Sequence, residues 1–182
     1  MKIKLLTRSG LLITLGIILP YITHMTGVAG SVLLPMHLPP LLAGFLISPF
    51  YALLIGAILP PLNFAISGMP PMPTMAFMIL ELSAFGLFTG LIYHKLNKIN
   101  INKKSNIFIS LIGAMLIGRI IYVLIFSLLI EFENPLAIIA GGIITGLPGI
   151  ISQLILIPLI VISLENKNNL KKNSKKLNNL TE

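Results

Sequence analysis

The sequence predicts an all-α integral membrane protein that crosses the bilayer about six times. Hydrophobic residues make up 55% of the 182 residues and charged residues only 10%, whereas soluble domains carry roughly 25% charged residues. Apolar runs recur along the chain, most of them near the roughly 20 residues that a spanning helix needs. We expect one transmembrane domain over residues 1–165 and a basic, mostly disordered tail over 166–182.

Six apolar runs define the expected helices, at about 5–22, 38–48, 50–66, 74–93, 107–130 and 136–164. The first run should end near Pro20, because proline lacks a backbone N–H and disrupts a helix interior. The second run is too short to span a bilayer by itself. It is either a short tilted helix or one arm of a re-entrant hairpin with the third run, and in both cases other helices must shield it from lipid.

The positions of the basic residues predict the orientation. All but one of the 13 Lys and Arg residues lie before the first run, between the fourth and fifth runs, or in the tail. Cytoplasmic segments are enriched in Lys and Arg, and six crossings place these three clusters on one side. We therefore expect a plasma-membrane protein with both termini in the cytoplasm. The same clustering argues against nucleic acid as a partner, although the tail could contact anionic membrane lipids.

Two charged residues lie inside the expected spans, Glu81 in the fourth and Arg119 in the fifth. A charge in the bilayer costs roughly 3 kcal/mol or more unless it is paired or hydrated, so both need an explanation. In a six-span topology both lie in the outer or middle third of the membrane, where they could meet. They form either an ion pair that holds two helices together or part of a substrate cavity in which Arg119 binds a carboxylate or phosphate.

Other features near the outer side are weaker candidates for a binding site. His37 could hydrogen-bond a ligand, although a lone histidine at a membrane interface is more often solvated. Asn63 could reach a ligand or hydrogen-bond another helix. The connections at 35–40 and 67–73 are rich in proline and methionine, and they form either a lid over an outward-facing pocket or short rigid turns.

Several function classes lack support in the sequence. There is no glycine-rich nucleotide loop, no series of acidic residues for coupling to protons or sodium, and no Ser/His pair or His-Glu metal motif. Cysteine is absent, which excludes thiolate chemistry, and the histidines are too far apart to form a metal site. We therefore expect a protein that is not an enzyme and that needs no cofactor.

The chain resembles the substrate-binding S components of energy-coupling-factor (ECF) transporters, a family of vitamin importers, over about residues 8–162. The length and the six expected spans fit this family. The resemblance also rests on four segments: Gly-Leu-Leu-Ile-Thr at 10–14, Met-His-Leu-Pro-Pro-Leu-Leu-Ala-Gly-Phe at 36–45, the proline-rich stretch at 59–73, and Gly-Leu-Pro-Gly-Ile at 146–150.

The resemblance implies partners and a location for the site. The partners would be a transmembrane coupling subunit and two cytoplasmic ATPase subunits. The first helix of the family carries Ala-x-x-x-Ala against the coupling subunit, and Gly10 and Thr14 hold the matching positions here, with small size retained. Family ligands bind near the outer side, between the outer loops and helices four to six. That region here includes these residues: Glu81, Arg119, Gly142 and Thr145.

The leading hypothesis is therefore a substrate-binding subunit of an ECF importer, which captures a vitamin-class micronutrient outside the cell for ATP-driven uptake. A carboxylate-bearing ligand such as pantothenate or niacin would suit Arg119. One alternative is a secondary transporter that works alone, but coupling-ion residues are absent. Another is a membrane scaffold without a ligand, in which Glu81 and Arg119 are purely structural.

Overall fold

The computed structural model describes residues 2–25, 30–99, 101–129 and 135–181, and within these ranges it does not describe the side chains of 2, 24, 30, 31, 129, 135–143 and 168–181. The described chain is helical and contains no strand, which confirms the predicted all-α class. In order, the elements are α1 (Lys2–Met25), α2 (Gly30–Leu33), the 3-10 turn η1 (Pro35–His37), α3 (Leu38–Leu46), α4 (Pro49–Ser67), α5 (Thr74–Lys98), α6 (Lys103–Leu129) and α7 (Pro135–Thr181).

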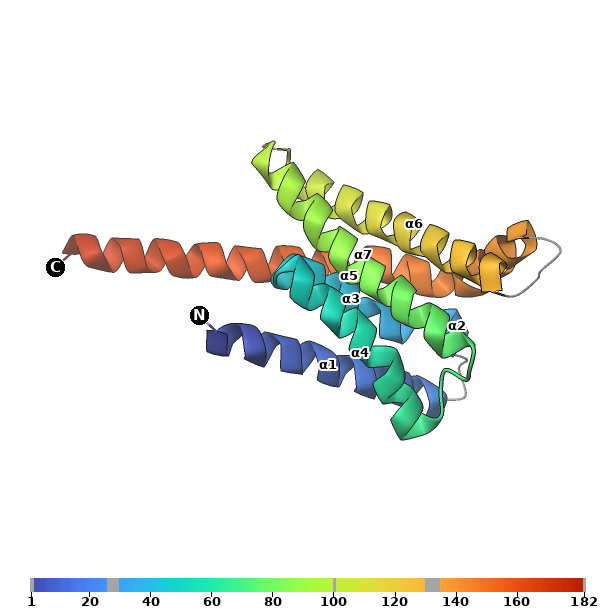
Figure 1. Ribbon diagram of the computed structural model, residues 1–182. Coiled ribbons are helices and arrows are strands. Elements are labelled where there is room, and N and C mark those ends of the chain that lie inside the picture. The colour runs from blue at the N-terminus through green and yellow to red at the C-terminus, as the bar shows by residue number, and fades with distance from the viewer. Residues whose placement is uncertain (1, 26–29, 100, 130–134, 182) are drawn as a thin grey trace.

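Five helices are long and apolar enough to cross a membrane, and they contain the segments Ile3–Thr23, Pro49–Ser67, Thr74–Lys98, Lys103–Leu128 and Ile144–Lys167. The sixth expected element is α3. Its nine residues extend only roughly 14 Å at about 1.5 Å per residue, less than the roughly 30 Å of a hydrocarbon core. Both termini and the connection between α5 and α6 lie toward one end of the bundle (Figure 1).

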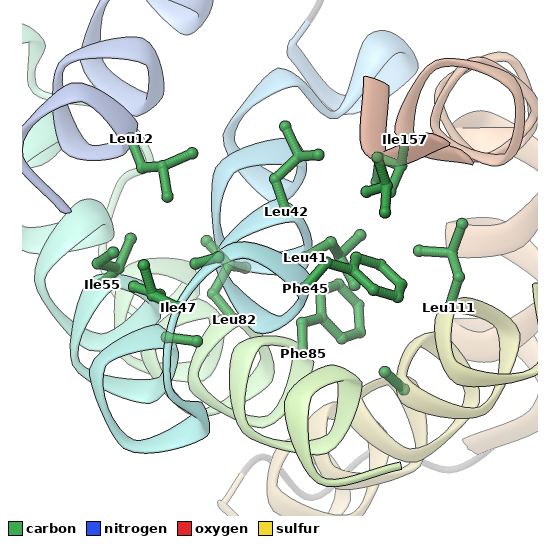
Figure 2. Close-up of a cluster of buried hydrophobic side chains, with 14 of the residues drawn as sticks. Leu12, Leu41, Leu42, Phe45, Ile47, Ile55, Leu82, Phe85, Leu111 and Ile157 are labelled. Atoms are coloured by element: carbon green, nitrogen blue, oxygen red, sulfur yellow. The ribbon is translucent and has the colours of Figure 1, made fainter. Parts of the chain in front are cut away.

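The short helix α3 lies inside the bundle. Every residue from Pro39 to Phe45 is buried, and α3 packs against α1, α4, α5 and α7. Figure 2 shows Leu41, Leu42 and Phe45 of α3 surrounded by apolar side chains of these helices and of α6. Lipid is thereby kept away from α3, which meets the requirement for a short element at membrane depth.

Arg8 of α1 contacts the C-terminal end of α3. Its guanidinium Nη1 donates a hydrogen bond to the carbonyl oxygen of Leu46 over 3.2 Å. A cation at this position also interacts favourably with the negative end of the helix dipole. The end of α3 therefore lies level with the basic N-terminal part of α1, which favours the short-helix interpretation over a re-entrant hairpin.

The prediction that the first helix ends near Pro20 is wrong, because α1 continues to Met25 with Pro20 inside it. Proline cannot donate to the carbonyl four residues earlier, which is that of Gly16. Asn63 of α4 supplies the missing donor: its Nδ2 bonds the Gly16 oxygen over 3.0 Å. A neighbouring helix thus satisfies the backbone group that proline leaves free, which makes proline tolerable in a membrane helix.

Helices α4 and α5 approach each other closely through two glycines. A methyl group added at Gly56 would overlap the backbone of Leu82 and Ser83, and one added at Gly86 would overlap the backbone carbonyl of Ala52. Small residues allow such contact between membrane helices, where van der Waals packing rather than the hydrophobic effect drives association. This close packing fixes the position of α5, the helix that carries Glu81.

At the end of the bundle near the termini, a buried polar network joins α5, α6 and α7. Asn106 Nδ2 donates to the Tyr93 carbonyl over 3.1 Å and to Asn97 Oδ1 over 2.9 Å. Ser110 Oγ donates to Asn106 Oδ1 over 2.9 Å, and the Tyr93 hydroxyl donates to Glu165 Oε1 over 2.5 Å. The residues of this network lie at the ends of apolar runs, where hydropathy gives no sign of a buried polar contact.

Helix α7 has 47 residues and includes Pro148 and Pro158. It continues as helix to Thr181, through most of the segment 166–182 for which we expected mostly disorder. Its five lysines and three leucines are good helix formers, whereas its six asparagines are not. No break in α7 marks residue 165, so the division into a domain and a separate tail stays a prediction.

The contact between α4 and α5 gives a test of the fold. Gly56→Ala should destabilise the purified protein by about 1–3 kcal/mol, because the added methyl group forces the two backbones apart. Gly10→Ala is the matched control, since a methyl group there would meet nothing within 4 Å, and its stability should stay equal or rise by up to about 1 kcal/mol. Melting in detergent measures both, and equal melting temperatures for the two variants would contradict the close contact.

Candidate functional site

The two charged residues that the sequence placed inside spans meet in the structure. Arg119 Nη1 of α6 lies 3.2 Å from Glu81 Oε1 of α5, which confirms that the two can reach each other across the helix pair. The Glu81 side chain is 2% exposed, whereas the Arg119 side chain is 21% exposed. The arginine is therefore the accessible partner of a buried carboxylate.

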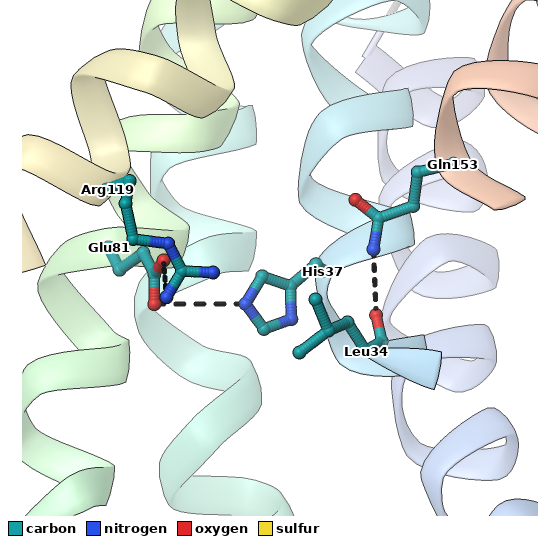
Figure 3. Close-up of polar contacts among 5 residues, drawn as sticks. All are labelled: Leu34, His37, Glu81, Arg119 and Gln153. Atoms are coloured by element: carbon teal, nitrogen blue, oxygen red, sulfur yellow. Dashed lines mark hydrogen bonds and ion pairs between the residues drawn. The ribbon is translucent and has the colours of Figure 1, made fainter. Parts of the chain in front are cut away.

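His37 is the third member of this cluster. Its Nε2 lies 3.8 Å from Glu81 Oε2, beyond hydrogen-bond distance, and Figure 3 shows the Arg119 and His37 side chains both next to the Glu81 carboxylate. The imidazole packs against Phe85 with ring centroids 5.4 Å apart. The expectation of a solvated histidine is wrong, since this side chain is only 4% exposed.

The backbone conformation of Leu34 explains how His37 reaches the interior. Leu34 adopts a left-handed conformation with φ of 49° and ψ of 45°, which costs a non-glycine residue about 1 kcal/mol or more. Its carbonyl oxygen accepts hydrogen bonds from the His37 backbone N–H and from Gln153 Nε2 of α7, each over 3.1 Å. Gly149 of α7 packs directly on the backbone of this segment. Helix α7 thus holds η1 so that His37 points at Glu81 (Figure 3).

The cluster has unused hydrogen-bonding capacity. The buried atoms without a hydrogen-bond partner among the described residues include Glu81 Oε1 and His37 Nδ1 of the cluster and Oε1 of Gln153, whose amide holds Leu34. The contact of Glu81 Oε1 with Arg119 is an ion pair without the alignment of a hydrogen bond. A guanidinium carries five N–H donors, so Arg119 has donors left for another acceptor. Buried polar atoms without partners mark a place where a polar ligand would be stabilised.

A group of aromatic side chains lies beside the ion pair. Along α5 and α6 these side chains are one to two helical turns further than Glu81 and Arg119 from the end of the bundle that holds the termini. Phe77 of α5 packs against Tyr122 and Phe126 of α6, with centroid distances of 5.9 and 5.1 Å. The Arg119 guanidinium lies 5.8 Å from the Tyr122 ring centroid, within range of a cation–π interaction. These rings make the surface beside Arg119 apolar, and their spacing to Glu81 and Arg119 on each helix could have indicated them.

Asn63, Gly10 and Thr14 do not join this cluster. Asn63 is buried, and its Nδ2 serves the carbonyls of Gly16 and Leu59. Thr145 is exposed on α7, and Gly142 lies outside the residues whose surroundings the structure describes. Gly10 and Thr14 are exposed on α1.

The energetic role of the ion pair can be measured by double substitution. Arg119→Met leaves the Glu81 carboxylate buried without its cation, and breaking a buried pair in this way costs about 3–5 kcal/mol. Glu81→Gln together with Arg119→Met removes both charges and should recover most of that loss. Melting temperatures of the parent, both single variants and the double variant give the coupling energy. Additive effects of the two substitutions would mean that the ion pair does not stabilise the fold.

A comparison with models of known protein families finds one that fits this arrangement. Residues 4–161 match the family model described as ECF transporter, substrate-specific component. No curated protein and no solved structure matches the chain. The matched region contains the whole cluster of Glu81, Arg119 and His37, and it ends within α7.

Proposed function

Because the chain belongs to the family of substrate-specific components of ECF transporters, we propose that it captures a vitamin-class micronutrient outside the cell for ATP-driven uptake. Family membership makes it a multi-pass membrane subunit that binds a small molecule and associates with other components of the transporter. The observation that carries the finer proposal is the buried cluster of Glu81, Arg119 and His37, whose polar atoms are not all satisfied within the described chain.

The ligand that suits this cluster carries a carboxylate. Arg119 is its most exposed member and keeps N–H donors that Glu81 does not use. Guanidinium and carboxylate groups form paired, charge-assisted hydrogen bonds, and these are stronger than neutral ones. Pantothenate and nicotinate are vitamins with such a group. The neighbouring rings of Phe77 and Tyr122 would exclude water and strengthen the interaction.

The orientation that we propose places both termini in the cytoplasm. The basic residues near the N-terminus and in the tail lie at the same end of the bundle as the α5–α6 connection, which is also basic (Figure 1). This is the distribution expected of cytoplasmic segments. The cluster then lies toward the outer side, where it can meet a ligand arriving from outside the cell.

The energy for uptake would come from partners, because the sequence has no nucleotide-binding loop. We assign the contact with a transmembrane coupling subunit to the exposed face of α1. Residues on this face recur at helical spacing: Ile3, Thr7, Gly10, Thr14, Ile18, Tyr21 and Met25, all exposed. Gly10 and Thr14 keep the face flat at its centre, and the Thr14 hydroxyl bonds the Gly10 carbonyl within the helix over 2.9 Å. A flat stripe of this kind allows close approach of another membrane helix.

Ligand capture is tested on the purified protein with matched pairs of compounds. Pantothenate and nicotinate should each be compared with a neutral analogue, pantothenol and nicotinamide, by thermal shift and calorimetry. At least one carboxylate should bind more tightly than its neutral partner. In the double variant with Glu81→Gln and Arg119→Met, its affinity should fall about tenfold to a hundredfold, since a charge-assisted hydrogen bond contributes roughly 1.5–3 kcal/mol.

The matched control is Arg8→Met, which removes an arginine at the other end of the bundle and should leave the affinity unchanged. A double variant with parent affinity would refute contact between Arg119 and the ligand and leave a structural ion pair. If none of the four compounds nor any other vitamin raises the melting temperature, the proposed capture function is wrong.

Partner docking is tested by enlarging the centre of the α1 face. Gly10→Leu with Thr14→Leu should abolish uptake by the complete transporter in cells, because bulky side chains separate the helices. Ligand binding by the isolated subunit should persist, since this face is exposed and away from Glu81. The control variant, Ala65→Leu with Ser105→Leu, enlarges two exposed residues on α4 and α6 and should keep uptake. Loss of binding together with uptake would instead indicate a packing role for the stripe.

A further inference from the structure

Glu81 has two basic neighbours, Arg119 and His37, and its carboxylate accepts an aligned hydrogen bond from neither. Its Oε1 contacts Arg119 over 3.2 Å without an aligned hydrogen bond. Its Oε2 faces His37 Nε2 over 3.8 Å, which is too long for a direct hydrogen bond. The other imidazole nitrogen, Nδ1, is buried without a partner. A small rotation of Glu81 would therefore exchange one basic neighbour for the other.

An anionic ligand at Arg119 creates a conflict of charge. The guanidinium carries one positive charge and already faces the Glu81 carboxylate. A second carboxylate beside it leaves one negative charge uncompensated in a buried environment, where charges are poorly screened. Two carboxylates that share one site do not both stay ionised unless another positive charge arrives. The nearest group that can acquire such a charge is the imidazole of His37.

Few other titratable groups face His37 among the described residues. The elements around it contribute Glu81 from α5, and Arg119 and Tyr122 from α6. Helix α3 has no titratable side chain, and Gln153 of α7 is uncharged. The titratable residues of α1 and α4 whose surroundings are described are all exposed: Lys4, Arg8, Tyr21 and Tyr51. A proton that compensates the ligand charge is therefore held by His37 and Glu81.

We propose that a carboxylate ligand binds together with one proton. The ligand carboxylate takes the N–H donors of Arg119, and Glu81 moves toward His37. His37 Nε2 takes up one proton from the buffered solution, and the resulting N–H donates a hydrogen bond to Glu81 Oε2. One anion and one proton enter, so the net charge of the cluster stays the same. The inference rests on the proposed capture function, and it adds that His37 and Glu81 form the proton site.

Calorimetry of the full-length protein in detergent tests the proton directly. Binding of pantothenate and of nicotinate is measured at one pH near neutrality in buffers that differ in ionisation enthalpy. The dependence of the binding enthalpy on the buffer gives the number of protons taken up. We expect about one proton per bound carboxylate and none for pantothenol or nicotinamide. The affinity for the carboxylate should also fall as the pH rises, by up to tenfold per unit.

The variant Glu81→Gln tests whether proton uptake depends on Glu81 itself. It removes the competing negative charge, so the carboxylate should bind with equal or higher affinity and without proton uptake. The matched control is Glu165→Gln, which removes a carboxylate at the other end of the bundle and should leave the uptake of one proton unchanged. Continued uptake by Glu81→Gln would refute the role of Glu81, and the parent measurement remains decisive if this variant does not fold.

The outcomes distinguish this inference from the capture function. A carboxylate that binds the parent protein without proton uptake overturns the inference alone. A neutral vitamin that binds while the carboxylates do not overturns the inference and leaves capture in place. Absence of binding by every vitamin overturns both.

Discussion

The buried carboxylate of Glu81 sets the requirements that the surrounding structure meets. A charge at this depth is stable only if cationic and polar groups surround it, and they come from separate parts of the chain. Arg119 approaches from α6, and His37 approaches from η1, which α7 holds through Gln153 and Leu34. The close packing of α4 on α5 at Gly56 fixes the helix that carries Glu81. Residues of α4, α6, α7 and η1 thus position or surround the carboxylate of Glu81.

A second constraint is that backbone groups must be satisfied without water. Pro20 frees the carbonyl of Gly16, and Asn63 covers it. The left-handed Leu34 directs its carbonyl toward two donors at once. In both places a polar side chain of a distant helix compensates for an irregular backbone, as the hydrocarbon environment demands. Asn63 and Gln153 therefore hold separate elements together through their uncharged amide groups.

Hydropathy predicted the all-α class and most of the long apolar helices, because a lipid environment leaves few alternatives to such helices. The meeting of Glu81 and Arg119 also followed from counting residues along two adjacent helices. The burial of His37 did not, because it depends on one backbone conformation at Leu34 that leucine rarely adopts. The passage of α1 through Pro20 depended on a partner 43 residues later, Asn63. The residues around Pro20 do not show that the side chain of Asn63, far along the chain, will bond the free Gly16 carbonyl.

The short helix α3 lies between the candidate site and the N-terminal part of α1. His37 directly precedes its first residue, and the carbonyl of Leu46 at its end accepts a hydrogen bond from Arg8, two residues before Gly10. Every residue from Pro39 to Phe45 is buried against the surrounding helices. With nine residues α3 is too short to span a bilayer, and this short length lets it lie wholly inside the bundle, between His37 and the Leu46 carbonyl.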